Sequence, residues 1–139
     1  MKTPTWLDSS AILTLLCAEP GTEIVRDCLE RAERKSHTVL ISTLSLTEIV
    51  SSIARVHGEE VAREDIRLIN EMPVQFLSPT AEDCAIAGWL RAKHKLSTAD
   101  AIIAAQAMSA KAELIHKDPE LESIPNLKQL KLPYKKTRH

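Results

Sequence analysis

Short apolar segments alternate along this chain with segments in which apolar residues recur at helical spacing. The run Val39-Leu40-Ile41, within residues 38–42, is typical of a strand that is buried on both faces of a sheet. Further strands are predicted at residues 3–7, 74–77, 113–116 and 130–132. Strands separated by crossover helices build a parallel sheet with helices on both faces. The pattern therefore predicts an α/β domain with a central parallel sheet of four or five short strands.

Helices are predicted between these strands, because apolar residues recur there at the spacing of one helix face. The expected helices cover residues 10–18, 44–57, 61–72 and 80–94, and two more begin near residues 22 and 97. Pro20 and Gly21 end the first of them. The helix that begins near residue 97 is rich in alanine, which predicts close packing against its neighbours.

The length and composition fit one globular domain. With 139 residues, 44% of them hydrophobic and 27% charged, the chain can bury a core, and residues 1–139 are expected to form a single domain. Its three cysteines form no Cys-x-x-Cys pair, so neither a disulfide framework nor a zinc site is predicted. Aromatic residues make up only 3%, so stacking of bases on a row of aromatic side chains is not expected.

The formal net charge of the chain is −1, so any contact with a polyanion has to be local. A candidate basic patch lies near the end of the chain and consists of Lys128, Lys131, Lys135, Lys136 and Arg138. The last few of these residues fit a flexible, solvated basic tail equally well. No segment reaches the length needed to cross a bilayer, and no leader-like apolar stretch stands at the N-terminus. A cytoplasmic protein without membrane contact is expected.

Four acidic residues stand where the predicted elements would bring them to one edge of the sheet. Asp8 directly follows the first strand, and Asp118 comes just after the fourth. Glu48 lies in the first turn of the helix after the second strand, and Asp100 lies in the first turn of the alanine-rich helix. Open α/β sheets bind ligands beyond the carboxyl ends of their strands. We therefore expect the four carboxylates to meet there.

Each of these acids also has a purely structural interpretation. Asp8 suits a helix cap, and Asp118, which precedes Pro119, suits a turn. Glu48 and Asp100 each stand three residues after a serine, as in a capping box. Taken singly, Glu48 and Asp100 are better explained as capping residues than as catalytic ones.

The four carboxylates together are harder to explain as caps. Acidic side chains in one pocket repel one another, and such clusters either take up protons or hold a cation. Oxygen ligands without His or Cys favour a hard cation, Mg²⁺ or Mn²⁺, over zinc. The interpretation that unites these residues is a magnesium site in which Mn²⁺ substitutes.

Four segments of the chain resemble the PIN-domain nucleases, and among them the VapC toxins of toxin–antitoxin pairs. They are LDSSAIL around Asp8, SLTEIVSSI around Glu48, LSTADAIIAAQA around Asp100 and IHKDPELESI around Asp118. The resemblance implies a PIN-like three-layer sandwich over residues 1–139. It also implies a magnesium-dependent endoribonuclease that hydrolyses RNA phosphodiesters, acts as a toxin, forms a homodimer and is blocked by a cognate antitoxin protein.

The resemblance assigns catalytic and metal-binding roles to the four acids. Asp8 and Asp100 would hold the metal, which would activate water and neutralise the scissile phosphate. Glu48 and Asp118 would complete the coordination or orient the attacking water.

Three neighbouring positions bear on the substrate. Ser10 stands where the family usually has Ser or Thr, and its hydroxyl would support the metal or a phosphate, although a hydrogen bond to the backbone explains it equally well. His116, two residues before Asp118, stands where the family often has Thr. Glu120, two residues after Asp118, stands where the family often has Asp. His116 is kept as a candidate RNA contact.

Two other functions stay open. One is a magnesium-dependent phosphatase or phosphoacceptor domain on a similar sheet. Haloacid-type phosphatases need a second Asp two residues after the nucleophile, where this chain has Ser10, and receiver domains need a pair of acids beside the first strand. The other is a non-catalytic PIN-like module that binds RNA or protein, and the retention of all four acids counts against it.

Overall fold

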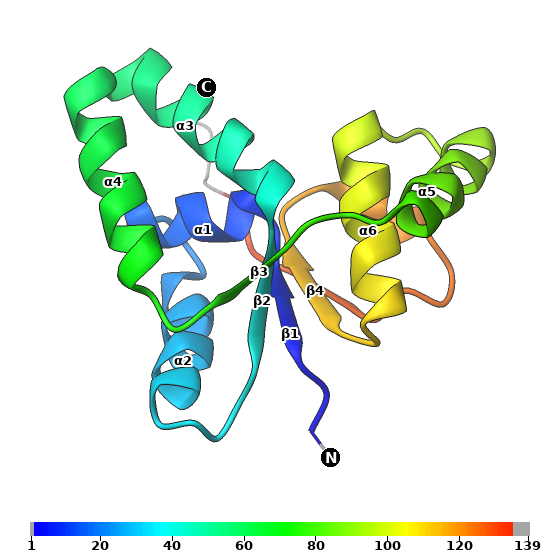
Figure 1. Cartoon of the computed structure of the whole chain (residues 1–139), viewed down its shortest axis with the longest axis horizontal. Coiled ribbons are helices and arrows are strands. Elements are labelled where there is room, and N and C mark those ends of the chain that lie inside the picture. Colours follow the sequence, from blue (N-terminus) through cyan, green and yellow to red (C-terminus); the bar gives the residue numbers. More distant parts are fainter. Residues whose placement is uncertain (1, 135–139) are drawn as a thin grey trace.

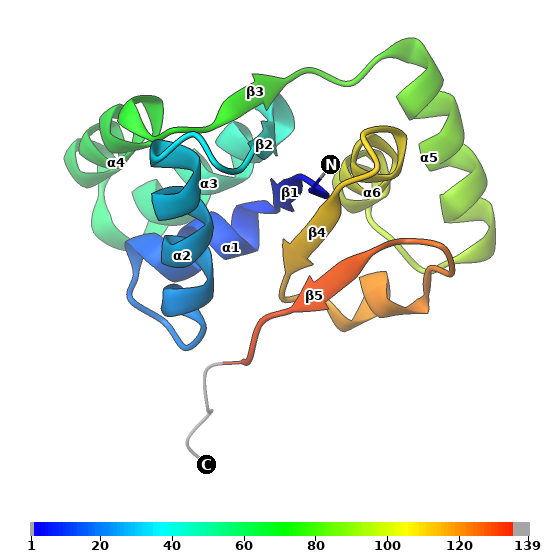
Figure 2. The same ribbon diagram turned by 90° about the horizontal axis from the view of Figure 1, so that it is seen from below.

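A parallel sheet forms the centre of the molecule. The computed structural model describes residues 2–134, so Lys135, Lys136 and Arg138 of the candidate basic patch lie outside the described residues. Within the described part, the sheet has five strands: β1 (Thr5–Leu7), β2 (Val39–Ser42), β3 (Gln75–Leu77), β4 (Glu113–His116) and β5 (Gln129–Lys131). Their order is β3-β2-β1-β4-β5, and all neighbours are parallel (Figure 2). The predicted parallel sheet is confirmed.

Helices cover both faces of the sheet and make the fold a three-layer sandwich (Figure 1). One face carries the helices α1 (Ser9–Leu16), α2 (Thr22–Glu33), α3 (Thr43–His57) and α4 (Glu59–Glu71). The other face carries α5 (Ala81–Lys93) and α6 (Thr98–Ser109). A short 3₁₀ helix, η1 (Pro119–Ser123), follows β4 and was not predicted from the sequence. No helix in the described range has the length and apolar character that a membrane crossing requires.

The two halves of the core follow from the alternation of side chains along the strands. In β1, Trp6 packs with the core on the α5 and α6 side, whereas Leu7 packs with the core under α1 to α4. In β4, Leu114 and Ile115 divide in the same way, and all four side chains are at most 1% exposed. Because both faces of the central strands are buried, apolar residues follow one another directly in each of them, as in Trp6-Leu7 and Leu114-Ile115, which is why these sequences show no alternation.

The alanine-rich helix α6 packs closely on the sheet, as its small residues predicted. Ala101, Ala104, Ala105 and Ala107 are all 0% exposed. Small side chains let the helix backbone approach its neighbours, and α5 makes its principal packing contacts with this helix. This packing fixes the position of the first turn of α6, where Asp100 lies.

Candidate active site

The four acids predicted from the sequence line one cavity of about 400 Å³, here called the acid cavity. Asp8 follows β1 and caps α1, and Asp118 follows β4 and caps η1. Glu48 comes from α3, and Asp100 from the first turn of α6. Residues from both helical layers and from the carboxyl ends of the two central strands therefore meet at one place. The other residues that line the cavity are Ser9, Ser10, Leu13, Ser52, Lys117, Pro119 and Tyr134.

Asp8 is the most deeply buried of the four acids, with 5% of its surface exposed. It accepts hydrogen bonds from the backbone N–H of Ser10 (3.2 Å) and from the Ser10 hydroxyl (2.6 Å). Burial raises the pKa of the Asp8 carboxyl above its ordinary value, although the hydrogen bonds from Ser10 act against this. The Ser10 hydroxyl in turn accepts from the backbone N–H of Lys117 (3.1 Å), so it links the α1 end of the cavity to the loop after β4.

Asp100 and Asp118 face each other across the cavity. Burial, the hydrogen bond between these two carboxyls, and the charges of Asp8 and Asp118 raise the pKa of Asp100 to about 7. Near neutral pH the Asp100 carboxyl is therefore partly protonated, which reduces the repulsion between it and Asp118. A cation that replaced this proton would relieve the same repulsion.

Glu48 supplies a carboxylate oxygen without a partner. Its Oε1 atom is buried and accepts no hydrogen bond from any described residue. Burial raises the pKa of Glu48, the charge of Asp8 raises it further, and a hydrogen bond from Ser9 opposes the shift. A buried, unsatisfied oxygen costs free energy unless something outside the described chain binds it.

The donor set fits a hard divalent cation. It consists of carboxylate and hydroxyl oxygens, which suit Mg²⁺ or Mn²⁺, and it includes the unpaired oxygen of Glu48. Within residues 2–134, no three His, Cys, Asp or Glu side chains are arranged to hold a metal ion as they stand. Asp8 accepts from the Ser10 hydroxyl instead (2.6 Å), and Asp118 accepts from the backbone N–H of Glu120 (2.9 Å). Small rotations of these side chains, or bridging waters, would be needed to bind the ion.

The capping interpretation holds for some of these acids and fails for others. Helix α3 begins at Thr43 with Ser42 as its cap, so the predicted capping box of Ser45 and Glu48 is wrong. Ser97 does cap α6 and accepts from the backbone N–H of Asp100 (3.1 Å). The carboxylate of Asp100 nevertheless lines the cavity. Only the Ser97 half of the predicted capping box is thus present among the described hydrogen bonds, and the Asp100 carboxylate does not act as a cap.

A complete capping box begins α5 and has no connection with the cavity. Asp83 accepts from the backbone N–H of Thr80 (2.9 Å) and from the Ser109 hydroxyl (3.0 Å), while Thr80 accepts from the backbone N–H of Asp83. Burial acts to raise the pKa of Asp83, but these hydrogen bonds outweigh it and lower the pKa below its ordinary value.

Replacing this capping carboxylate should destabilise the protein without affecting the acid cavity. We expect Asp83→Asn to lower the free energy of unfolding by about 1–2 kcal/mol near neutral pH. The lowered pKa means that the stabilisation is present above the ordinary pKa of an aspartate and is lost as the pH falls through the folded-state value. Urea unfolding at neutral and acidic pH measures both effects. Glu82→Gln, on the exposed side of the same turn, is the control, and an equal loss in both variants would contradict the assignment.

His116 does not line the acid cavity. Its side chain is 0% exposed, its Nδ1 accepts the backbone N–H of Asp118 (3.0 Å), and its Nε2 lies 2.8 Å from Oε1 of Gln129. Because the amide oxygen only accepts and Nδ1 already accepts, the proton must be on Nε2. The ring therefore fastens the Asp118 loop to β5, and the geometry gives no support to the predicted RNA contact.

Lys117 lines the acid cavity and was missed in the sequence. Its Nζ lies 3.1 Å from Oε1 of Glu19, and its side chain is 12% exposed. The only sequence signal was its position between two residues already singled out, His116 and Asp118. A lysine in such a position is usually a solvated surface residue, so its burial could not be predicted.

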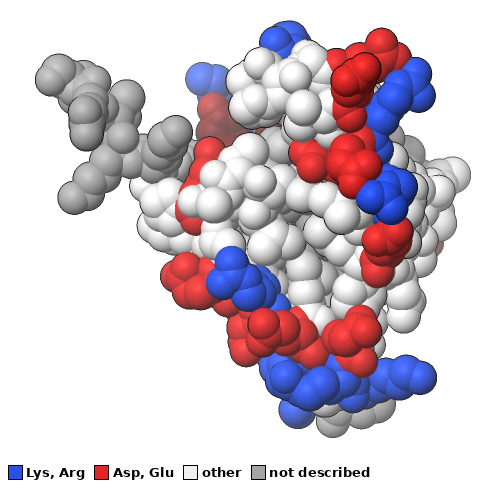
Figure 3. All heavy atoms as spheres, turned by 90° about the vertical axis from the view of Figure 1, so that its left-hand side faces the viewer, with Lys and Arg blue, Asp and Glu red and all other residues white. Residues whose placement is uncertain are grey.

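Two of the hollows outside the acid cavity are larger than it is. An apolar groove of about 770 Å³ runs between α1, α3 and α4, is lined by Leu16, Val56 and Val61 among others, and shares Leu13 and Ser52 with the acid cavity. Figure 3 shows the side of the molecule that carries α3 and α4, where a largely uncharged area is bordered by charged residues.

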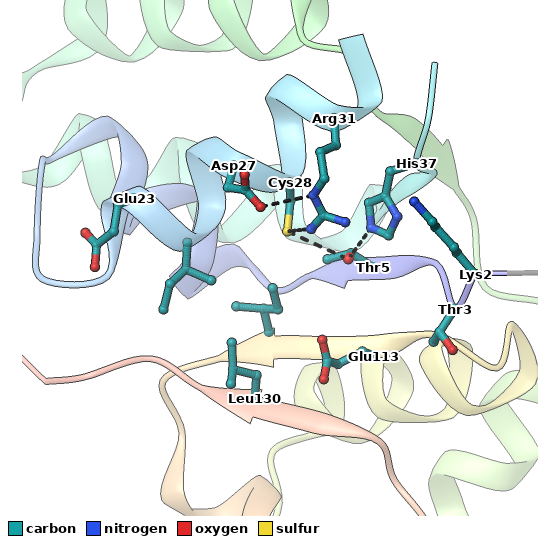
Figure 4. Close-up of a pocket in the computed structure, with 12 residues that line it drawn as sticks. Lys2, Thr3, Thr5, Glu23, Asp27, Cys28, Arg31, His37, Glu113 and Leu130 are labelled. Carbon is teal, nitrogen blue, oxygen red and sulfur yellow. Dashed lines mark hydrogen bonds and ion pairs between the residues drawn. The ribbon is translucent and has the colours of Figure 1, made fainter. Parts of the chain in front are cut away.

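A third hollow, of about 540 Å³, lies beside the amino ends of β1 and β4, away from the four acids (Figure 4). Arg31 there pairs with Asp27 (3.0 Å), and the Thr5 hydroxyl lies 2.7 Å from Nε2 of His37. Figure 4 shows these side chains directed toward one another across the opening. Its charged side chains are of both signs, and Arg31 is paired with Asp27, so it is not a purely acidic site like the acid cavity.

The fold and the acid cavity define a three-layer α/β domain with an acidic site at the carboxyl ends of its central strands. The family model of the PIN domain matches residues 6–127, and the chain belongs to this family. No curated protein sequence matches the chain.

Solved structures share this fold at low sequence identity. A chain of VapBC2 from Rickettsia felis, bound to a DNA fragment from its promoter, is 19% identical and has a TM-score of 0.77, with 94% of this chain and 100% of that chain covered. A chain of a toxin–antitoxin complex from Klebsiella pneumoniae is 21% identical, with a TM-score of 0.65 and coverage of 94% and 98%. The sarcin–ricin loop cleaving toxin VapC20 of Mycobacterium tuberculosis is 16% identical, with a TM-score of 0.64 and coverage of 79% and 86%.

Proposed function

We propose that this protein is a magnesium-dependent endoribonuclease that acts as the toxin of a toxin–antitoxin pair. The observation that carries the proposal is the convergence of four carboxylates, from four separate segments, on one cavity of a PIN domain. One of these acids has a pKa raised to about 7, and another has a buried oxygen without a partner. Carboxylates that repel one another in this way are difficult to explain in a protein that binds no cation in the cavity.

The residues of the cavity suggest a division of roles. Asp8 and Asp100 would hold Mg²⁺, or Mn²⁺ in its place, with Asp118 as a further ligand. The ion would supply positive charge that offsets the charge of the phosphodiester and of its transition state. Glu48, through its unpaired oxygen, would orient the attacking water and accept its proton. Ser10 would hold Asp8 in position through the 2.6 Å hydrogen bond and not contact the substrate directly.

The proposed partner is a cognate antitoxin that occupies the apolar groove. Solved relatives of this fold include a toxin–antitoxin complex and VapBC2, which supports a partner of this kind. The groove adjoins the acid cavity, so a segment lying in it would also obstruct RNA. Exposed apolar side chains on α3 and α4, among them Val56 at 76% exposure, suit a protein partner. We further propose that the single PIN domain forms a homodimer and acts in the cytoplasm.

The test is cleavage of a mixed RNA pool by purified protein in Mg²⁺, in Mn²⁺ and in chelator. We expect endonucleolytic products with either ion and none in chelator. Cleavage that persists in chelator would contradict the mechanism. Release of phosphate from small phosphoesters without RNA cleavage would instead favour the phosphatase. RNA binding without products would favour the non-catalytic module.

A further inference from the structure

Lys117 is the one Lys or Arg side chain that lines the acid cavity among residues 2–134. Its backbone is tied to the centre of the site, because its N–H donates to the Ser10 hydroxyl (3.1 Å) and that hydroxyl donates to Asp8 (2.6 Å). The neighbouring Asp118 follows it directly in the chain. A positive charge is thus built into a site whose other ionisable side chains are acidic.

The ammonium of Lys117 is held by Glu19. The Nζ to Oε1 distance is 3.1 Å, and the two side chains are only 12% and 29% exposed. By contrast, Lys95 pairs with Glu120 at 3.8 Å and its side chain is 93% exposed. The pair of Lys117 and Glu19 is therefore shielded from solvent, where charge-assisted hydrogen bonds are stronger than on the surface.

Glu19 occupies a well-defined position between α1 and α2. Its carbonyl oxygen accepts from both the backbone N–H (3.1 Å) and the hydroxyl (2.6 Å) of Thr22. Gly21, in the same turn, has a φ of +98°, and a side chain there would meet Leu132 and Pro133 at 3.1–3.4 Å. The turn is thus tightly packed, so the carboxylate of Glu19 is presented to Lys117 from a fixed backbone.

The ion pair lies where the two hollows meet. Lys117 lines the acid cavity, Glu19 lines the apolar groove, and Leu13 and Ser52 line both. An RNA strand that enters the acid cavity would bring its phosphates next to a group of acids. A polyanion is repelled by such a field unless a local cation compensates for it.

We propose that Lys117 binds a backbone phosphate of the RNA beside the scissile one, and that Glu19 holds its ammonium when no RNA is bound. This inference rests on the proposed ribonuclease function. The exchange replaces one charge-assisted hydrogen bond to an oxyanion with another, so it needs little reorganisation. Released Glu19 would face the groove and its solvent. A lysine contact to phosphate positions the strand and reads no base.

Binding of a labelled single-stranded RNA, measured by fluorescence anisotropy in chelator over a range of salt concentrations, tests the inference. We expect Lys117→Met to weaken binding about 10-fold and to reduce the dependence of log K on log salt by about one unit. Lys117→Arg should retain binding, and Glu19→Gln should strengthen it because the lysine is freed. Lys93→Met, which removes an exposed charge from α5, is the matched control.

Kinetics in Mg²⁺ give the second readout. Lys117→Met should raise KM about 10-fold and leave kcat within about 3-fold, because binding of a remote phosphate is lost. Thermal unfolding should show that Lys117→Met and Glu19→Gln are folded.

The inference would be overturned if Lys117→Met and Lys93→Met bound RNA equally well. It would also be overturned if Glu19→Gln lost as much binding as Lys117→Met. If the wild-type protein binds RNA but does not cleave it, the proposed function fails while the anisotropy series still decides the role of Lys117. A wild-type protein that neither binds RNA in chelator nor cleaves it in Mg²⁺ would overturn both.

Discussion

The Asp8→Asn and Asp100→Asn proteins are expected to remain folded and to cleave RNA about 1,000-fold or more slowly than the wild type, a loss of about 4 kcal/mol of transition-state stabilisation. Each substitution keeps the size of the side chain and removes one negative charge from the proposed metal ligands. The neutral amide is a weaker ligand for a hard cation than a carboxylate. Single-turnover cleavage at saturating Mg²⁺ measures the effect.

Binding of Mn²⁺ provides a readout that does not depend on activity. Both variants should bind Mn²⁺ more weakly than the wild type in a direct titration. Asp83→Asn is the control, because Asp83 is a buried acid in a capping box outside the cavity. It should keep wild-type affinity for Mn²⁺ and wild-type cleavage. Retention of cleavage in either Asp8→Asn or Asp100→Asn would exclude the proposed site.

The metal-free protein should become less stable as the pH rises from about 4 to about 7. The pKa of Asp100 is raised to about 7 in the folded state, from an ordinary value of 3.8. Over this interval the folded protein therefore holds a proton that the unfolded chain has released. The free energy of unfolding must then fall as the pH increases. The raised pKa values of Asp8 and Glu48 act in the same direction.

The expected loss is about 1–2 kcal/mol. A shift of this size in a fully buried group would correspond to about 4 kcal/mol, but Asp100 is only partly buried and solvent screens its interactions. Asp100→Asn should remove the share of the pH dependence that Asp100 contributes and stabilise the metal-free protein near pH 8, the opposite of the effect of Asp83→Asn. In the wild-type protein, saturating Mg²⁺ should recover the stability that is lost as the pH rises, because the ion binds the folded state. Urea unfolding in chelator at several pH values measures this, and parallel curves for wild type and Asp100→Asn would refute it.

The secondary structure could be predicted from the sequence because its signals are local. β4 was predicted at its observed bounds, and most helices were predicted to within about two residues, since periodicity and caps lie within each segment. η1 was missed, because its cap Asp118 and its first residue Pro119 were interpreted as a turn. The start of α3 was predicted to within one residue, but its cap was placed at Ser45, whereas Ser42, the last residue of β2, caps the helix.

The roles of side chains around the site needed the tertiary structure. His116 was considered for RNA contact, yet its partner Gln129 is on β5, 13 residues away. Lys117 is paired with Glu19, 98 residues earlier in the chain. Contacts over such separations depend on how the strands are ordered and how the loops pack. No periodicity within a segment encodes them.

The sequence by itself determined that strands and helices alternate, that the sheet is parallel, and that Asp8, Asp100 and Asp118 stand at the starts of helices or just after strands, whereas Glu48 lies in the second turn of α3. Those properties follow from hydrophobic periodicity and from the geometry of parallel crossovers. Only the tertiary structure decided that β1 and β4 are neighbours, which brings Asp8 beside Asp118. It also decided that Asp100 lies close enough to Asp118 for Asp118 to raise the pKa of Asp100, because that depends on the packing of α6 against the sheet.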